Sequence, residues 1–374
     1  MRSVHRVAGF GDWLRASARP WEVVSFLWIP GLALVYACWF MLRSPEALQD
    51  FAIFRRAAVQ VLHGHSPYVA PTAAAVGHFD KFVYPPVAAL VFAPYTAFPS
   101  EVARALMFFA GLAAIVGALR LLQVKDWRCY SLALVSAPAF NSLGVGALTS
   151  FLLLGAAVAW RYRDNAVVAG VAAAFTAVLK LFLWPVAVWL VATRRWRAAF
   201  VCVGVAVGLL LGGWTVIGFA GLHSYPKLVH VLEQVEGPVS YSTVALLGLT
   251  GGAETAATVV FSLLAIGAIW VAARGPDGDR RALAVAVAAS LFVTPLLWLH
   301  YLLFVYVPIA LYRPRLSGLW FVPLLLWATP TTHSHGITSR IAIALAVLAL
   351  VAARTVFAGA RVSRAAAVPR PVAG

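Results

Sequence analysis

The chain contains few charged residues. Asp, Glu, Lys and Arg make up 11% of its 374 residues, whereas soluble domains contain roughly 25%. Hydrophobic residues make up 62%, and several apolar runs reach the ~20 residues that a helix needs to cross a bilayer. The shortage of charge excludes an ordinary soluble domain, and the sequence predicts an all-α, polytopic membrane protein.

Cysteine is also scarce. Cys38, Cys129 and Cys202 lie far apart in apolar stretches, so neither a disulfide framework nor a cysteine metal site is indicated. Small buried hydrophobic side chains are the simpler interpretation. No cluster of other metal-ligating residues is visible, and we predict neither a metal nor a cofactor.

Acidic residues are outnumbered by basic ones, 13 to 29, which gives a net charge of +16. The basic residues lie between hydrophobic segments and at both ends of the chain, as the positive-inside rule requires. We therefore expect no nucleic-acid partner. We expect a single integral membrane domain over residues 1–374, with cytoplasmic tails at 1–20 and 359–374 and a retained anchor at 21–42.

Residues 43–83 form the one long polar stretch, directly after the first hydrophobic segment. We expect this segment to be an extracytoplasmic loop that carries the catalytic residue. Apolar residues at helical spacing between Ala47 and Leu62 predict a helix lying in the membrane interface, ended by Gly64. The apolar stretch 84–122 fits one crossing or two.

Three further stretches leave one basic cluster and return to another, with polar or helix-breaking residues midway. If the basic clusters are cytoplasmic, each stretch is a hairpin of two short helices. Polar residues and irregular backbone at such depth are tolerated where they line a cavity. The three tips therefore predict one polar chamber that opens outward. They are Asn141–Gly146 within 125–163, Lys180 within 163–195, and Pro295 with His300 within 280–315.

Each polar candidate in these segments has two interpretations. Asp50 begins the interfacial helix and is either a general base or an acid favoured by the helix dipole. Asp80 is its rival on the same loop. Lys180 has no acid nearby in sequence, so it either extends to the interface or binds an anionic ligand. His300 is either a hydrogen-bonded histidine of the bundle or a ligand group.

Several short motifs follow one another along the chain. They are Asp50-Phe51, Gly64-His65-Ser66-Pro67-Tyr68, Lys81-Phe82-Val83-Tyr84-Pro85-Pro86, Lys180, and Pro295 with Trp298, His300 and Tyr301. Taken in this order, they resemble glycosyltransferase family 87 of the GT-C superfamily, from about residue 49 to 312. The sequence departs from the family at Gly146-Ala147, where a glycine-glutamine pair is common, and at Leu181, where proline is usual.

The resemblance implies a GT-C fold with about 10–13 transmembrane or re-entrant helices and interfacial helices in its extracytoplasmic first loop. It also implies an inverting transfer from a polyprenyl-phosphate sugar to an envelope glycolipid or lipoglycan, on the outer face of the cell membrane. Mannose is the first expectation for the sugar and arabinofuranose the second. Partners of the chain would then be the lipid donor, the acceptor and membrane lipid.

The resemblance also assigns roles to residues. It implies that Asp50 is the general base. We expect Lys180, His300 and Arg55 to bind the donor phosphate, since charge develops there as the phosphate leaves. The candidate substrate contacts are Asp80, Lys81, Tyr84 and Tyr301.

Two other functions remain open. A lipid or sugar-lipid transporter would also have a polar cavity, but it should show related halves or broken helices on both sides. A polymerase or ligase of lipid-linked glycans should have several arginines in its outer loops, and these loops have few.

Overall fold

The computed structural model describes residues 19–44, 46–78, 81–275, 277–329 and 338–357, and every regular element in these ranges is a helix. The predicted all-α class is confirmed. Most of the expected tails 1–20 and 359–374 lies outside the described residues, and so does the candidate Asp80.

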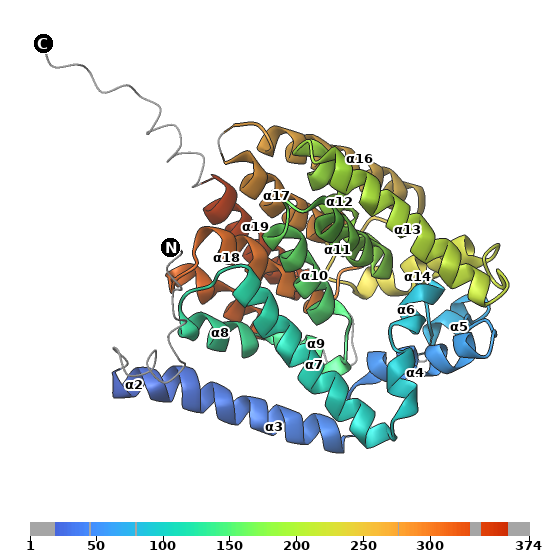
Figure 1. The fold of residues 1–374 in the computed structure, drawn as a ribbon, viewed down its shortest axis with the longest axis horizontal. Helices are drawn as coiled ribbons and strands as arrows, with labels where there is room; N and C mark the ends of the chain where they lie inside the picture. Colours follow the sequence, from blue (N-terminus) through green and yellow to red (C-terminus); the bar gives the residue numbers. More distant parts are fainter. Residues whose placement is uncertain (1–18, 45, 79–80, 276, 330–337, 358–374) are drawn as a thin grey trace, which may run out of the picture.

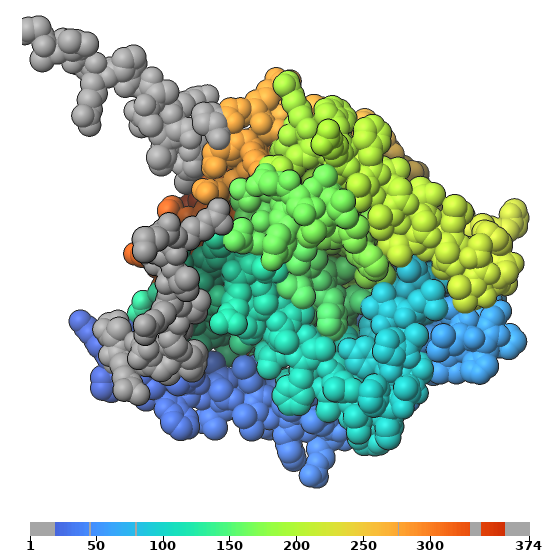
Figure 2. All heavy atoms as spheres, in the orientation of Figure 1, coloured from blue at the N-terminus to red at the C-terminus, as the bar shows by residue number. Residues whose placement is uncertain are grey.

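Five helical segments of the described chain are long and apolar enough to cross a membrane, which makes this a multi-pass membrane protein. The first one lies along one edge of the molecule (Figure 2), and apolar side chains on it such as Leu32 and Val35 are exposed. The five are Pro20–Arg43 (α2 Pro20–Val23, η1 Val24–Trp28, α3 Ile29–Arg43), α7 Ser100–Leu121, α13 Trp196–Val216, α16 Gly251–Ala272, and Thr338–Thr355 (α19 Thr338–Ala352 with the start of η8 Ala353–Phe357).

Shorter helices gather at one end of the bundle, which we call the α4 end (Figure 1). There α4 packs on α6 and η2, and α5 packs on α14. The helix predicted in this segment is present and begins at Gln49 after the left-handed Leu48; its place in the membrane interface stays a prediction. The short helices are α4 Gln49–Leu62, α5 Ala73–Gly77, α6 Pro86–Leu90, η2 Ala93–Ala97, α14 Tyr225–Glu236, η4 Gly237–Val239 and α15 Thr243–Leu246.

The stretch 84–122, which fitted one crossing or two, contains a single long helix. The helices α6 and η2 have only five residues each, and α7 has 22. At about 1.5 Å per residue, α6 and η2 are far too short to cross a bilayer. The stretch therefore supplies one crossing.

The three predicted hairpins are built from short helices with breaks between them. The first contains three helices instead of two, and its break follows Val145, so Asn141 lies inside α9. There the chain turns by 117° between α9 and α10. The second breaks at Lys180, and the third breaks at 294–298 just before His300. The helices are α8 Trp127–Leu134, α9 Ala137–Val145 and α10 Thr149–Arg161; α11 Ala166–Leu179, η3 Leu181–Leu183 and α12 Trp184–Ala192; α17 Gly278–Val293, η5 Leu299–Val305 and α18 Tyr306–Tyr312.

The apolar segment 317–330 contains two short helices. These are η6 Gly318–Trp320 and η7 Val322–Ala328, both of the 3₁₀ type. The 3₁₀ helix rises about 2 Å per residue, so together they reach about 20 Å at most.

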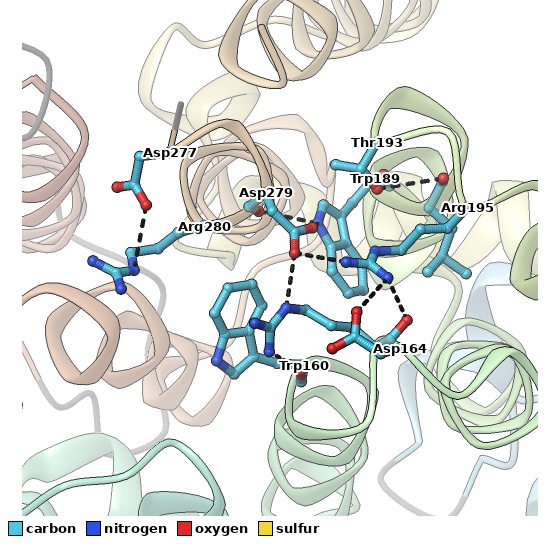
Figure 3. A network of polar contacts seen from close by, with 10 residues as sticks. Trp160, Asp164, Trp189, Thr193, Arg195, Asp277, Asp279 and Arg280 are labelled. Carbon is cyan, nitrogen blue, oxygen red and sulfur yellow. Dashed lines mark hydrogen bonds and ion pairs between the residues drawn. The ribbon is translucent and has the colours of Figure 1, made fainter. Parts of the chain in front are cut away.

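At the other end of the hairpins, basic turns converge on one carboxylate (Figure 3). Asp279, in the first turn of α17, accepts hydrogen bonds from Arg163 Nε at 2.8 Å and Arg195 Nη2 at 2.9 Å. Trp189 Nε1 donates to it at 3.2 Å. Arg163 also lies over the ring of Trp160, 4.2 Å from the centroid. This network fixes the ends of α10, α12 and α17 relative to one another, and so fixes where their breaks lie.

Candidate functional site

A cavity of about 620 Å³ lies where the breaks in the three hairpins face α4 and α14. This volume is within the usual range for a small-molecule site. Its wall carries polar groups from all of these elements on a largely aromatic and aliphatic surface. They include Asp50, Lys81, Tyr84, Asn141, Lys180, Glu233, Glu236, Thr294, His300 and Tyr301.

Asp50 lies in the first turn of α4 and lines the cavity. Two aromatic residues of the same helix, Phe51 and Phe54, are fully buried and anchor it; Phe54 stacks on Phe92 with ring centroids 4.5 Å apart. Burial raises the pKa of the Asp50 carboxyl above its usual value, and the nearby charge of Lys180 opposes part of that rise. Asp50 is thus a stronger base than an ordinary surface aspartate.

Lys180 stands at the break between α11 and η3, with only 3% of its surface exposed. Its Nζ atom lies 3.3 Å from His300 Nε2 and 4.1 Å from the centroid of the Tyr301 ring. The Tyr301 ring is itself fixed by Phe182, which stacks on it at 4.4 Å. Aromatic faces attract a cation, which helps to hold this ammonium group away from water.

His300 joins Lys180 to a residue from the first hairpin. Its Nδ1 atom lies 3.1 Å from the side-chain oxygen of Asn141 on α9. The structure therefore brings together Asp50, Lys180 and His300, as the sequence predicts. Asn141 marked a polar tip in the sequence, but its contact with His300 was not predicted, because no local pattern relates residues 159 positions apart.

Arg55, the third expected phosphate ligand, is not among the residues that line this cavity. Its guanidinium donates to the carbonyl oxygens of Tyr95, at 3.3 Å, and Phe98, at 3.0 Å. Arg55 follows Asp50 by five residues, which is about 140° around a helix. The two side chains therefore leave α4 in different directions.

The candidate contacts Lys81, Tyr84 and Tyr301 line the cavity. Lys81 forms an ion pair with Glu236 of α14. Sequence reasoning did not identify Glu236 as its partner, and it also missed Glu233, which lines the same cavity. Two tyrosine hydroxyls fix the backbone of this wall. Tyr68 donates to the carbonyl oxygen of Tyr84 at 2.8 Å, and Tyr225 donates to that of Val83 at 3.0 Å.

Metal ligands are not grouped in the part of the chain that the structure describes. No three His, Cys, Asp or Glu side chains there lie close enough together to hold a metal ion. A transfer that needs no metal stays a prediction. The described groups supply a carboxylate able to accept a proton and, in the same cavity, a buried ammonium able to bind an anion.

Comparison with known proteins gives two matches. The model of glycosyltransferase family 87 matches residues 82–299, a stretch that contains Asn141 and Lys180, begins after Asp50 and ends one residue before His300. The Alpha-(1->3)-arabinofuranosyltransferase of Mycolicibacterium smegmatis is 25% identical over 270 residues, which is 66% of this chain. The match spans 61% of that protein, less than two thirds of its length. No solved structure gives a significant match.

Proposed function

The chain belongs to glycosyltransferase family 87, and on that basis we propose that it moves a sugar from a polyprenyl-phosphate donor to a glycolipid or lipoglycan acceptor. The observation that carries this proposal is one cavity that contains both a proton-accepting carboxylate, Asp50, and a buried cation, Lys180. A transfer by direct displacement needs both groups, one for the incoming hydroxyl and one for the departing phosphate.

Lys180 supports an anionic donor. Its ammonium has no ion-pair partner within 4.0 Å among the described carboxylates, and a buried charge without a partner is costly. A phosphate group in the cavity would supply the missing negative charge. The same ammonium would then stabilise the charge that grows on the phosphate as the sugar leaves.

Asp50 supports the second half of the reaction. In the proposed step the acceptor hydroxyl oxygen forms a bond to the anomeric carbon, while the bond from that carbon to the phosphate oxygen breaks. The hydroxyl proton passes to the Asp50 carboxylate, and polyprenyl phosphate leaves with the bonding electron pair. Attack from the face opposite to the phosphate inverts the anomeric configuration. General-base catalysis typically contributes 10²–10⁴-fold to the rate.

The sugar has two candidates. Mannose is the first, from the resemblance of the sequence to mannose-transferring members of the family. Arabinofuranose is the second, and the relative named as an arabinofuranosyltransferase supports it. A transporter is the weaker alternative, because the short broken helices gather their polar tips at one end of the described bundle.

We propose that the cavity faces the extracytoplasmic side. The arginine-rich turns around Asp279 (Figure 3) adjoin the ends of α10, α12 and α17 that lie away from the breaks, and such turns normally remain in the cytoplasm. Single cysteines test this placement once Cys38 has been replaced. His65→Cys should react with an impermeant maleimide added outside, whereas Arg274→Cys should not; the reverse pattern would place the cavity inside.

The proposed activity is tested with purified protein in lipid nanodiscs. Labelled polyprenyl-phosphate mannose and polyprenyl-phosphate arabinofuranose are supplied separately with an envelope glycolipid fraction, and the initial rate of transfer is measured. We expect the protein to transfer the sugar from one of these two donors. Asp50→Asn should lower the rate by about 10²-fold or more, while Glu46→Gln, an exposed acid four residues earlier, should leave it unchanged. Normal turnover in Asp50→Asn would show that Asp50 is not the general base. A lack of transfer from both lipids would show that polyprenyl-phosphate sugars of these two kinds are not the donors.

A further inference from the structure

Asn141 is one of the polar side chains of the cavity wall to which the proposed mechanism gives no role. We propose that Asn141 is a positioning residue that sets the tautomer of His300 and, through His300, the direction in which Lys180 presents its ammonium group. The contacts among Asn141, His300 and Lys180 are observed in the structure and do not depend on the proposed function. Their effect on sugar transfer rests on the proposed function.

The assignment follows from what each group is able to donate. A lysine ammonium has three N–H donors and no acceptor. Since Lys180 Nζ lies 3.3 Å from His300 Nε2, Nε2 must be the accepting, unprotonated nitrogen of a neutral ring. The ring hydrogen is then on Nδ1, which lies 3.1 Å from Asn141 Oδ1. An amide oxygen accepts this hydrogen bond, so the orientation of the amide is fixed as well.

The other tautomer would disrupt the cation site. With its hydrogen on Nε2, the imidazole would point a donor at the ammonium, and neither group could accept. Lys180 would lose its contact and move away from the Tyr301 ring, which lies 4.1 Å from Nζ in this structure. With Nε2 as acceptor, one ammonium N–H is directed to His300 and two remain for the oxygens of a bound phosphate.

The backbone around Asn141 is fixed by contacts that do not involve its side chain. One residue further along, Ser142 Oγ lies 2.9 Å from Ser150 Oγ on α10. Near the end of α9, the carbonyl oxygen of Gly144 accepts a 2.7 Å hydrogen bond from the amide of Leu48. Replacing Asn141 by leucine therefore removes the accepting oxygen, keeps a similar volume, and leaves these anchors in place.

The experiment measures the tautomer directly. Nitrogen-15 spectra of histidine-labelled protein in nanodiscs distinguish Nδ1–H from Nε2–H rings, and His300→Gln identifies the signal of His300 among the nine histidines. The unchanged protein should show a single Nδ1–H ring. Asn141→Leu should give a mixture of tautomers, with Asn141→Ala as a second variant if it misfolds. Asn141→Asp should restore the single Nδ1–H form, since a carboxylate also accepts from Nδ1.

Kinetics supply a second measurement. Asn141→Leu should raise the KM for the lipid donor about tenfold, the usual effect of losing one hydrogen bond, and leave the KM for the acceptor unchanged. A single Nδ1–H ring in Asn141→Leu, or an Nε2–H ring in the unchanged protein, would overturn the proposal. If the tautomers are as expected but the protein uses neither lipid donor, the role of Asn141 is supported and the proposed function is wrong. If Asn141→Leu uses the donor normally while Asp50→Asn is inactive, the proposed function is supported and Asn141 has no role in donor binding.

Discussion

The backbone amide of Leu48 donates a 2.7 Å hydrogen bond to the carbonyl oxygen of Gly144. Leu48 adopts a left-handed conformation, with φ of 61°, directly before α4. Asp50 follows it by two residues, and Asn141 precedes Gly144 by three. One backbone contact between two short helices therefore positions the proposed base relative to the group that holds Lys180 and His300.

Gly146→Ala should displace α4 relative to α9, near the hydrogen bond between Leu48 and Gly144. A Cβ atom at Gly146 would lie 2.7 Å from Cβ of Phe51, and the φ of +68° is itself unfavourable for alanine. Because α4 must move to make room, we expect kcat to fall tenfold or more, since misplacement by about 1 Å is enough to cost 10²-fold. The measurement is the initial rate at saturating donor.

Gly144→Ala is the matched control for that change. Its added Cβ would meet only the flexible end of Met41, at 3.1 Å. We expect a much smaller loss of activity in this variant. Equal rates in the two variants would show that the position of α4 is not set at Gly146.

The pH dependence of transfer should report the surroundings of Asp50. A general base acts when deprotonated, so the rate should rise with pH through the pKa of Asp50, which burial places above the usual value near 4 for aspartate. The charge of Lys180 lowers this pKa. Lys180→Met should therefore move the acid limb of the rate profile to higher pH.

Lys81→Met removes the same charge from another part of the cavity wall, where Lys81 pairs with Glu236. This variant should leave the position of the acid limb unchanged, whatever its effect on the rate. An acid limb that stays in place in Lys180→Met would mean that Asp50 is not the titrating base.

Donor binding should separate Lys180 from Arg55. Lys180→Met removes the cation of the cavity and should raise the donor KM by at least tenfold, as expected for a lost hydrogen bond to a charged group. Arg55→Met should leave the donor KM unchanged, because its guanidinium is directed to the carbonyl oxygens of Tyr95 and Phe98. A raised donor KM in Arg55→Met alone would restore the arginine to the phosphate site.

Asp279→Asn should lower stability without changing the cavity chemistry. It removes the charge to which Arg163 and Arg195 donate (Figure 3). The carboxylate is 30% exposed, so we expect a loss of about 1–2 kcal/mol, in the lower range for hydrogen bonds with charged groups. Thermal unfolding in detergent measures it. Asp164→Asn, where the acid is 80% exposed, should have almost no effect on stability. Equal losses of stability in the two variants would show that Asp279 is not the centre of the network.

That Asp50, Lys180 and His300 would line one cavity could be predicted from the sequence, because each is a polar exception in an apolar context. Lys180 and His300 stand midway between basic clusters, and the hairpin geometry requires that such residues meet at one depth. Asp50 begins an amphipathic helix whose apolar face had to be buried. The break at Lys180 and a helix that begins near Asp50 were expected for these reasons, and the structure contains both.

What the sequence could not provide was contact between distant residues. The bond from His300 to Asn141 and the ion pair from Lys81 to Glu236 depend on how separate hairpins pack, and no local periodicity encodes that. The direction of the Arg55 side chain, in contrast, follows from the helical spacing in the sequence. A spacing of five residues places it away from Asp50 on any α-helix, whereas spacings of three and four place Ile53 and Phe54 beside Asp50 on the cavity wall.

The buried ammonium of Lys180 has a consequence for the end of each catalytic cycle. The proposed donor is a phosphodiester with one negative charge, whereas the spent carrier is a phosphomonoester with about −1.5 to −2 charges at pH 7. A cation with 3% of its surface exposed therefore attracts the product more strongly than the substrate. We therefore expect the spent lipid to remain bound after the sugar has been transferred, so that its release into the bilayer slows turnover.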